Sequence, residues 1–283
     1  MADGNRLGID IDYIYDSLGG FNRENMTEAI RLCKKYGFRN LDYLSTIEGD
    51  DYLDAAKFWR DEIEKNGLTV HQSHAPSFRY SLDKSLDEYK VALSRALDVA
   101  IELGTRYFVV HGDEYRLKEN EVYDPEKILA FCRELFAPYV ERARKNNISV
   151  AFENLFEDVL GKRFTSDIDE LLSLVDVFGK DSDVSICWDF GHANVAYKEG
   201  AIDAFKKAFP RITCTHVHDN YHGDDHLLPT LGLMDWKSYM SYMRENGYKG
   251  NITFELVYGR IPREIMDDFL SFARSVGEYL LSL

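Results

Sequence analysis

Apolar residues along this chain gather in eight short segments that are rich in β-branched and aromatic side chains. Longer stretches with helical periodicity lie between them. The segments start 29 to 42 residues apart, which is about the length of one strand–helix unit. The pattern predicts eight strands within the ranges 7–14, 40–45, 69–76, 107–113, 149–155, 184–192, 213–220 and 251–257.

The stretches between these segments carry signals for where helices begin and end. Ser85 and Glu88 have the spacing of a capping box, and Asp124 followed by Pro125 combines an N-cap with a proline at the first helical position. A last helical pattern covers residues 261–275. Three helices are expected to end at glycines, namely Gly37, Gly104 and Gly179.

Eight strands that alternate with helices predict a parallel sheet closed into a (β/α)8 barrel, or TIM barrel. No linker-like or low-complexity segment marks a boundary, so a single domain over residues 1–283 is expected. An open, doubly wound sheet is the second interpretation. Such a sheet usually carries a glycine-rich phosphate turn after its first strand, and residues 7–20 contain no GxGxxG pattern.

The barrel register brings polar residues of the late strands to one end. Residues i and i−2 of a strand point the same way, and the inward positions of a barrel stack in layers. In each late strand, the residue two positions before the terminal polar residue is small or β-branched and should face the barrel interior with it. The residue directly before the polar one is mostly large or apolar and should face the helices. The expected ring at the mouth is His111, Glu153, Asp189, His216 and Glu255, above Val109, Ala151, Cys187, Cys214 and Thr253.

Four residues of this ring form a predicted site for one divalent metal ion: Glu153, Asp189, His216 and Glu255. Carboxylates with one imidazole suit Mn²⁺, Mg²⁺, Co²⁺ or Zn²⁺, with Mn²⁺ favoured, and the lack of a thiolate argues against a structural zinc. Without an ion, the three carboxylates would repel one another and at least one would take up a proton. The alternative is that each residue is hydrogen-bonded separately to loop backbone.

Half of the eight histidines lie in one stretch, residues 215–229. Within it, His222 is expected to be exposed and Asp225 to point away from the site. His71 is out of register in its strand and is expected to pack or face outward. His218 is expected to contact substrate or a carboxylate of the metal site. The residues predicted to line the substrate site are His74, His111, His192, His218, Asp224 and His226.

Composition narrows the classes of partner. The formal charge of −15 argues against nucleic acid, because nucleic-acid-binding proteins usually carry a basic face. No segment has the apolar length of a membrane span or a signal peptide, and the four cysteines form no CxxC pair, so we expect a cytoplasmic protein with free thiols. A small-molecule partner is favoured, and a homo-oligomer is compatible with the sequence.

Seven short motifs follow one another along the chain: HAP at 74–76, VVHGD at 109–113, AFEN at 151–154, WDFGHAN at 188–194, HVHDN at 216–220, DDHLLP at 224–229 and FE at 254–255. In these motifs the chain resembles the sugar phosphate isomerase/epimerase family. These xylose isomerase-like barrels share their fold with endonuclease IV-type apurinic endonucleases. The resemblance implies a metal held by the same four residues that the barrel register selects, with Glu153 and Glu255 as the acid and base.

The implied reaction interconverts an aldose and a ketose, or epimerises a carbon beside a ketone. It requires removal of a C–H proton next to a carbonyl, with a metal-stabilised enediolate, and Glu153 is the preferred base while Glu255 returns the proton. A hydride shift across two metals, as in xylose isomerase, is also compatible with the sequence. The expected partner is a small-molecule sugar or sugar phosphate.

Other functions fit parts of this ligand set. A sugar-binding barrel without turnover, or a subunit of a larger enzyme, would be favoured by loss of the two glutamates, and both are present. A Schiff-base aldolase would need a lysine at a strand end, and none is found there. An endonuclease IV-like enzyme with three zinc ions would find one ligand group in His74, His111 and Glu153, a second in the four predicted metal ligands, and a third in His192, Asp224 and His226.

Two departures from the family pattern concern the substrate. Epimerases of free ketohexoses carry an arginine shortly after the histidine of the seventh strand, and residues 216–226 contain none. The sequence PTLG at 229–232 stands where PGEG is common in the family. Candidates for a phosphate clamp, each more simply explained as solvated surface, are Arg79, Lys162, Arg163 and Arg260.

Overall fold

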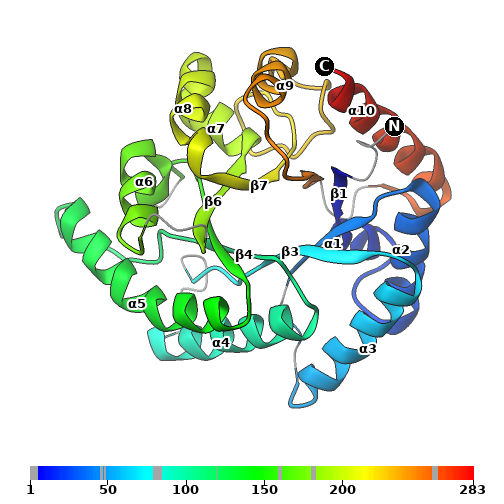
Figure 1. Cartoon of the computed structure of the whole chain (residues 1–283), viewed down its shortest axis with the longest axis horizontal. Coiled ribbons are helices and arrows are strands. Elements are labelled where there is room, and N and C mark those ends of the chain that lie inside the picture. The colour runs from blue at the N-terminus through cyan, green and yellow to red at the C-terminus, as the bar shows by residue number, and fades with distance from the viewer. Residues whose placement is uncertain are drawn as a thin grey trace.

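Eight parallel strands form a single barrel, which confirms the predicted fold (Figure 1). The structure is a computed structural model that describes residues 6–44, 47, 49–78, 85–118, 120–158, 161–179, 183–256 and 261–283. Neighbouring strands pair in the order β7-β6-β5-β4-β3-β2-β1-β8. The strands are β1 (Leu7–Asp10), β2 (Asn40–Leu44), β3 (Thr69–His74), β4 (Tyr107–His111), β5 (Ser149–Glu153), β6 (Val184–Asp189), β7 (Ile212–His216) and β8 (Ile252–Phe254).

The barrel closes between β7 and β8 through a short seam. Val217 forms an isolated parallel bridge with Phe254. The Val217 N–H donates to the carbonyl of Thr253 at 2.8 Å, and the Glu255 N–H donates to the carbonyl of Val217 at 3.3 Å. This seam sets Glu255, one residue beyond β8, beside the end of β7.

Helices surround the barrel (Figure 1). Among the described residues, no helix combines the length and the apolar character needed to cross a membrane. The helices are α1 (Ile11–Ser17), α2 (Arg23–Tyr36), α3 (Tyr52–Lys65), α4 (Leu86–Glu102), α5 (Pro125–Lys145), α6 (Ile168–Asp176), α7 (Phe190–Tyr197), α8 (Ala201–Ala208), α9 (Trp236–Glu245) and α10 (Met266–Ser282), with short 3-10 helices η2 (Phe164–Ser166), η3 (Lys198–Gly200), η4 (Phe209–Arg211) and η5 (Arg263–Ile265).

Most of the predicted helix signals act as expected. Ser85 and Glu88 form the complete capping box of α4, and Asp124 caps α5 through its side chain. Gly37 follows α2 with a φ of 76°, a left-handed conformation that suits glycine. The third glycine is an exception, because α6 already ends at Asp176 and a turn leads to Gly179.

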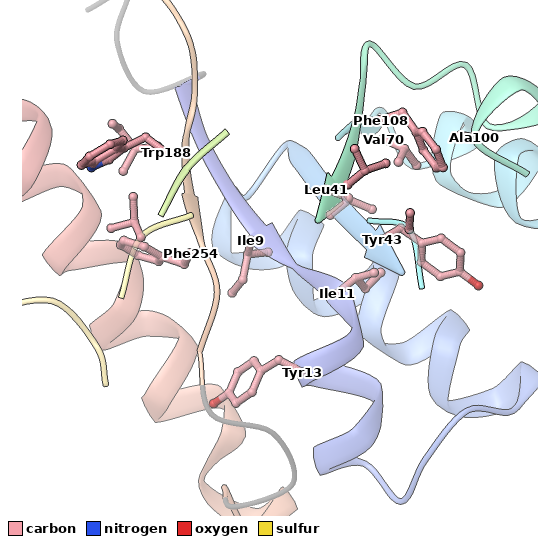
Figure 2. Packing of buried hydrophobic residues seen from close by; sticks show 14 of the residues in the cluster. Ile9, Ile11, Tyr13, Leu41, Tyr43, Val70, Ala100, Phe108, Trp188 and Phe254 are labelled. Atoms are coloured by element: carbon pink, nitrogen blue, oxygen red, sulfur yellow. The ribbon is translucent and has the colours of Figure 1, made fainter. Parts of the chain in front are cut away.

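Two layers of buried side chains lie on the two faces of the strands, as the alternation predicts. Inside the barrel, a separate cluster consists of Tyr107, Val109, Ala151, Cys187 and Cys214. Between the strands and the helices, a larger cluster includes Val110, Phe152, Trp188 and Phe254. Figure 2 shows part of this outer layer, where Ile9 of β1 lies beside Phe254, its partner in the strand register. The polar residue at the end of each late strand therefore lies on the inner face.

All eight strands end before their predicted ranges do, and in two of them the last residue is an aspartate that caps the helix that follows. β1 ends at Asp10, whose side chain accepts a hydrogen bond from the Asp12 N–H at 2.7 Å as α1 begins. β6 ends at Asp189, whose Oδ1 accepts from the His192 N–H at 2.6 Å. His192 thus lies in the first turn of α7 rather than on the strand.

Candidate metal centre

A cavity of about 550 Å³ lies at the carboxyl ends of the strands, where barrel enzymes hold their active sites. Predicted site residues from strands, loops and a helix end meet there. Those that line the cavity are His74, His111, Glu153, His192, Asp224, His226 and Glu255. Asp189, His216 and His218 are 0% exposed and are not part of its lining.

Glu153 is 1% exposed and contacts three imidazoles. Its Oε2 lies 3.0 Å from Nε2 of His74 and 3.2 Å from Nε2 of His111. Its Oε1 lies 2.8 Å from Nδ1 of His216. Burial alone would raise the pKa of this carboxyl, but the charge of His216 and the hydrogen bonds from the imidazoles outweigh it and hold the pKa well below its usual range. Glu153 is therefore ionised.

His216 presents its two ring nitrogens to different groups. Nε2 lies 2.8 Å from Oδ2 of Asp42, at the end of β2. Nδ1 faces the other three predicted metal ligands, at 2.8 Å from Glu153, 3.4 Å from Glu255 and 4.0 Å from Asp189. Because the Asp42 carboxylate accepts from Nε2, the Nδ1 side is the one that can coordinate a metal.

The donor set of these four residues fits a divalent cation. One ligand atom from each of Glu153, Asp189, His216 and Glu255 lies within 4.8 Å of all the others. In addition, Oε2 of Glu255 is buried and accepts no hydrogen bond from the described residues. Three carboxylates and one imidazole at this spacing, with a buried oxygen left over, offer the ligands that Mn²⁺, Mg²⁺, Co²⁺ or Zn²⁺ take in proteins.

The backbone and Asn154 hold Asp189 in place. The Asn154 side chain donates to the Asp189 carbonyl at 2.8 Å and accepts from the Asp189 N–H at 2.8 Å. Burial raises the pKa of Asp189, but the charges of His192 and His218 outweigh it and lower the pKa to about 2. In the predicted Asp189–His192 pair, Asp189 thus caps α7 and His192 forms part of the wall of the cavity.

A second group of metal-binding side chains lies beside the first. Nε2 of His192 and Nε2 of His226 lie 3.6 Å and 3.2 Å from Oδ1 of Asp224. The outer nitrogens, both Nδ1, face backbone carbonyls, of Asn154 at 3.1 Å and of Glu255 at 3.1 Å. A carbonyl only accepts, so each Nδ1 carries a proton and each Nε2 is directed toward Asp224. Burial raises the pKa of Asp224, but hydrogen bonds from both imidazoles lower it far below its usual range.

His111 differs from these histidines in its outer partner. Its Nδ1 lies 3.5 Å from Nη2 of Arg163, a group that can only donate. Nδ1 is therefore the accepting nitrogen, and Nε2 carries the proton that it shares with Glu153. Arg163 itself is 3% exposed, pairs with Asp113 and lines the cavity, so it is a buried residue of the cavity wall rather than solvated surface.

His218 is 0% exposed and is not part of the cavity lining, and its predicted contact with substrate stays a prediction. Its Nε2 lies 3.1 Å from Oδ1 of Asp189, and its ring stacks on that of His226 with centroids 4.0 Å apart. A Cβ at Gly191 would lie 1.9 Å from the His218 ring, so only glycine leaves room for this packing. The alternative expectation, contact with a carboxylate of the metal site, describes the geometry.

A sequence model described as a xylose isomerase-like TIM barrel matches residues 24–276 of this chain. The chain belongs to this family. Protein y4fM of Sinorhizobium fredii (strain NBRC 101917 / NGR234), which is described as uncharacterized, is 24% identical over 266 residues, or 82% of this chain and 81% of that protein.

Solved structures share the fold of this xylose isomerase-like barrel at low identity. D-psicose 3-epimerase in the presence of D-fructose has a TM-score of 0.75 and 17% identity, with 98% of this chain and 100% of that chain covered. The IOLI protein with a binding zinc atom has a TM-score of 0.77 and 15% identity, with 98% of both chains covered. At such identities the likeness establishes the shared fold.

Asp219 organises the loop that carries the histidine-rich stretch. This aspartate is 0% exposed and accepts four hydrogen bonds, from the backbone N–H groups of Asn220, Thr230 and Met234 and from the Trp236 indole, at 2.8 to 3.2 Å. Outside this anchor, His222 is exposed and Asp225 accepts from the Tyr221 N–H at 2.8 Å, so both lie where the sequence predicts.

The sequence analysis missed acidic residues of β1, α1 and β2. Asp10, Asp12, Asp16 and Asp42 line the cavity together with Tyr15. The signal was present, because Asp10, Asp12 and Asp42 alternate with apolar residues as inward-facing positions of a strand do. His71 packs edge-on against Tyr107 and lies outside the cavity, as expected.

We expect Asp219→Ala to destabilise the protein by more than about 3 kcal/mol, because four donors, two of them in buried hydrogen bonds, lose their acceptor at once. Chemical denaturation monitored by circular dichroism would measure the loss. Asp225→Ala, which removes an acceptor in the same loop at its exposed side, is the matched control and should change stability little. Equal effects of the two substitutions would contradict an anchoring role for Asp219.

The metal-free protein should lose stability as the pH rises from 6.5 toward 10. Burial lowers the pKa of His74, His192 and His226, but contacts with Glu153, Asp189 and Asp224 outweigh it and raise these values from 6.5 to about 9, 10 and 9. The folded state therefore binds more protons than the unfolded chain in this range, so their stabilisation is complete below pH 6.5 and is lost through pH 9–10. Denaturation of chelator-treated protein at several pH values tests this, and a flat profile would contradict it.

Proposed function

We propose that this xylose isomerase-like barrel is a divalent-metal-dependent isomerase or epimerase of sugars. One glutamate would remove a proton from the substrate and a second glutamate would return one. One observation carries the proposal: Glu153 and Glu255 both line the cavity and both approach the same nitrogen of His216, at 2.8 Å and 3.4 Å. Two carboxylates on either side of one buried point are what removal and return of a proton require.

Glu153, Asp189, His216 and Glu255 would hold the ion, with Nδ1 as the coordinating nitrogen of His216. When bound, the ion would act as a Lewis acid that polarises the substrate carbonyl and offsets the negative charge that develops as the proton leaves. The IOLI structure with its zinc atom supports a divalent ion in this fold. Mn²⁺ is the favoured metal because the set is rich in carboxylates.

The two glutamates differ in how firmly their oxygens are held. Three imidazoles lie 2.8 to 3.2 Å from the two oxygens of Glu153 and hold them in place. Oε2 of Glu255 accepts no hydrogen bond from the described residues. We therefore assign the first proton removal to Glu255 and the return to Glu153, the reverse of the preference based on sequence. In the reverse reaction the roles exchange.

The charge of the cavity favours an uncharged, hydroxyl-rich substrate over a sugar phosphate. Carboxylates that line it offer acceptors for hydroxyl groups and would repel a phosphate. Among the described clamp candidates, Arg163 lines the cavity but is paired with Asp113, and Lys162 lies outside the lining and pairs with Glu170 at 2.9 Å. Arg79 and Arg260 lie outside the described residues. D-psicose 3-epimerase, a structural neighbour named for epimerisation of a free sugar, supports this class.

Hydrolysis of abasic DNA is the second candidate function, and the group of His192, Asp224 and His226 favours it. That group could hold a further ion. The group of His74, His111 and Glu153 is less suited to an ion, because Nδ1 of His111 faces Arg163 and its Nε2 then carries the proton toward Glu153. The acidic lining of the cavity also opposes a DNA backbone.

Glu153→Gln and Glu255→Gln should each lower turnover of a ketose at least ~100-fold, because each removes a group that carries the transferred proton. The measurement is isomerisation or epimerisation of a panel of unphosphorylated ketoses and aldoses by the metal-loaded protein, with solvent deuterium incorporation to detect proton transfer.

His222→Ala is the control for this experiment, since His222 is an exposed histidine of the same loop and should leave turnover unchanged. Full activity in either glutamate variant would contradict the mechanism. Binding of a sugar by the wild type without turnover or deuterium exchange would instead indicate a non-catalytic barrel.

Protein purified without chelator or added metal should contain about one divalent ion per chain, held by the four ligands around His216. Metal analysis of the wild type and of Asp224→Ala tests this. Retention of the ion in Asp224→Ala, with weaker sugar binding, is the expected result. Two or more zinc ions, partly lost in Asp224→Ala, would contradict the single-ion centre and call for an assay on an abasic oligonucleotide.

A further inference from the structure

His216 has two ring nitrogens, and either could face a metal ion. In a neutral imidazole one nitrogen carries a proton and the other holds the lone pair that binds metal. Which nitrogen is which depends on the partner of the outer one. In this protein the outer partner of His216 is Asp42, whose Oδ2 lies 2.8 Å from Nε2.

A chain of hydrogen bonds across the barrel interior fixes Asp42 as an acceptor. Nε2 of Gln72 lies 2.9 Å from Oδ2 of Asp42 and 3.4 Å from the carbonyl of Thr215. Both of these oxygens accept, so the amide nitrogen of Gln72 must face them. The amide oxygen of Gln72 then accepts from the hydroxyl of Thr253 at 3.2 Å. Each donor and acceptor along this chain is thereby determined by its neighbours.

The chain of hydrogen bonds ends at His216, one of the four candidate ligands, and its members are almost completely buried. Thr253, Gln72, Asp42 and His216 are exposed by 1%, 0%, 3% and 0%. They belong to β8, β3, β2 and β7, so the chain joins four strands. A register shift between Leu41 and Asp42 pairs Asp42 with Gln72 in the neighbouring strand.

Packing alone does not account for a carboxylate at this position. Its Oδ1 is buried and accepts no hydrogen bond from the described residues, which costs free energy of folding. An apolar or amide side chain of similar size would fill the same volume without a buried charge. The carboxylate is explained if its contact with His216 matters more than the cost of burying it.

We propose that Asp42 is a positioning residue, which holds His216 as the tautomer with a proton on Nε2 so that Nδ1 faces the ion. The inference rests on the proposed metal-dependent function, since it assigns the outer partner of one of the four ligands. Asp42 would raise the affinity for the ion through the orientation and basicity of the imidazole and would not touch the substrate carbonyl.

Asp42→Asn keeps the shape of the side chain and removes the charge. The affinity for Mn²⁺ should fall by ~10- to 100-fold, the usual effect of removing a carboxylate behind a metal-bound histidine. The matched control is Asp16→Asn, which removes one negative charge from the cavity wall and leaves Asp42 intact. The control should weaken Mn²⁺ binding by only about threefold or less, as expected from general electrostatics. Titration calorimetry of the full chain measures both, and thermal unfolding of the metal-free variants shows that they fold.

The tautomer can be observed directly in Zn²⁺-loaded protein with ¹⁵N-labelled histidine, using His216→Gln to assign the signals. The expected spectrum shows Nδ1 of His216 bound to metal and Nε2 protonated. Coordination through Nε2, or a Mn²⁺ affinity of Asp42→Asn equal to that of Asp16→Asn, would overturn the proposal.

These outcomes separate the inference from the function on which it rests. If Asp42→Asn binds Mn²⁺ like the control while the wild type isomerises sugars, the role of Asp42 is wrong and the function stands. If the variant loses affinity as expected and the wild type turns over no sugar, Asp42 has the proposed role in a metal site of another function.

Discussion

Negative charge gathers at the mouth of this barrel, and burying it is the constraint on which the rest of the site depends. The carboxylates of Asp42, Glu153 and Asp189 are almost completely removed from water. Mutual repulsion at this spacing would drive protons onto them. Imidazoles prevent this, because Glu153 alone contacts three of them at 2.8 to 3.2 Å. The histidines thus do in the metal-free protein what a divalent ion would do when bound.

The histidines of the site are of two kinds, which differ in the outer contact, that is, the partner of the ring nitrogen that faces away from the carboxylates. The outer contacts of His192, His216 and His226 are acceptors, two carbonyls and one carboxylate, so the inner nitrogen is the one directed at the carboxylates of the site. The outer contact of His111 is the guanidinium of Arg163, which donates, so the inner nitrogen of His111 carries the proton. His111 and His216 are the same residue type at the same position, the end of a strand, yet they belong to different kinds. Whether a histidine can coordinate an ion or only donate a hydrogen bond is therefore decided by the partner of the ring nitrogen that faces away from the site.

The repeated strand–helix pattern could be predicted from sequence because each strand shows its alternation within a few residues. The same alternation places Asp42 between apolar Leu41 and Tyr43, but no local pattern reveals that it meets His216, which lies 174 positions away. The burial of His218 also escaped prediction, since it depends on the missing side chain of Gly191. The residues on the inner face of each strand could therefore be predicted from local alternation. Contacts between residues on different strands could be seen only in the structure.

The short seam between β7 and β8 has a consequence for the barrel as a whole. Other neighbouring strands share ladders of several paired residues, but these two meet through one bridge and a few hydrogen bonds. His216 lies on one side of the seam and Glu255 on the other. An ion bound by both would act as a cross-link that holds the barrel shut, so ion binding and closure would be thermodynamically coupled. Amide protons along this seam would then exchange with solvent more slowly in the loaded protein than in the free one.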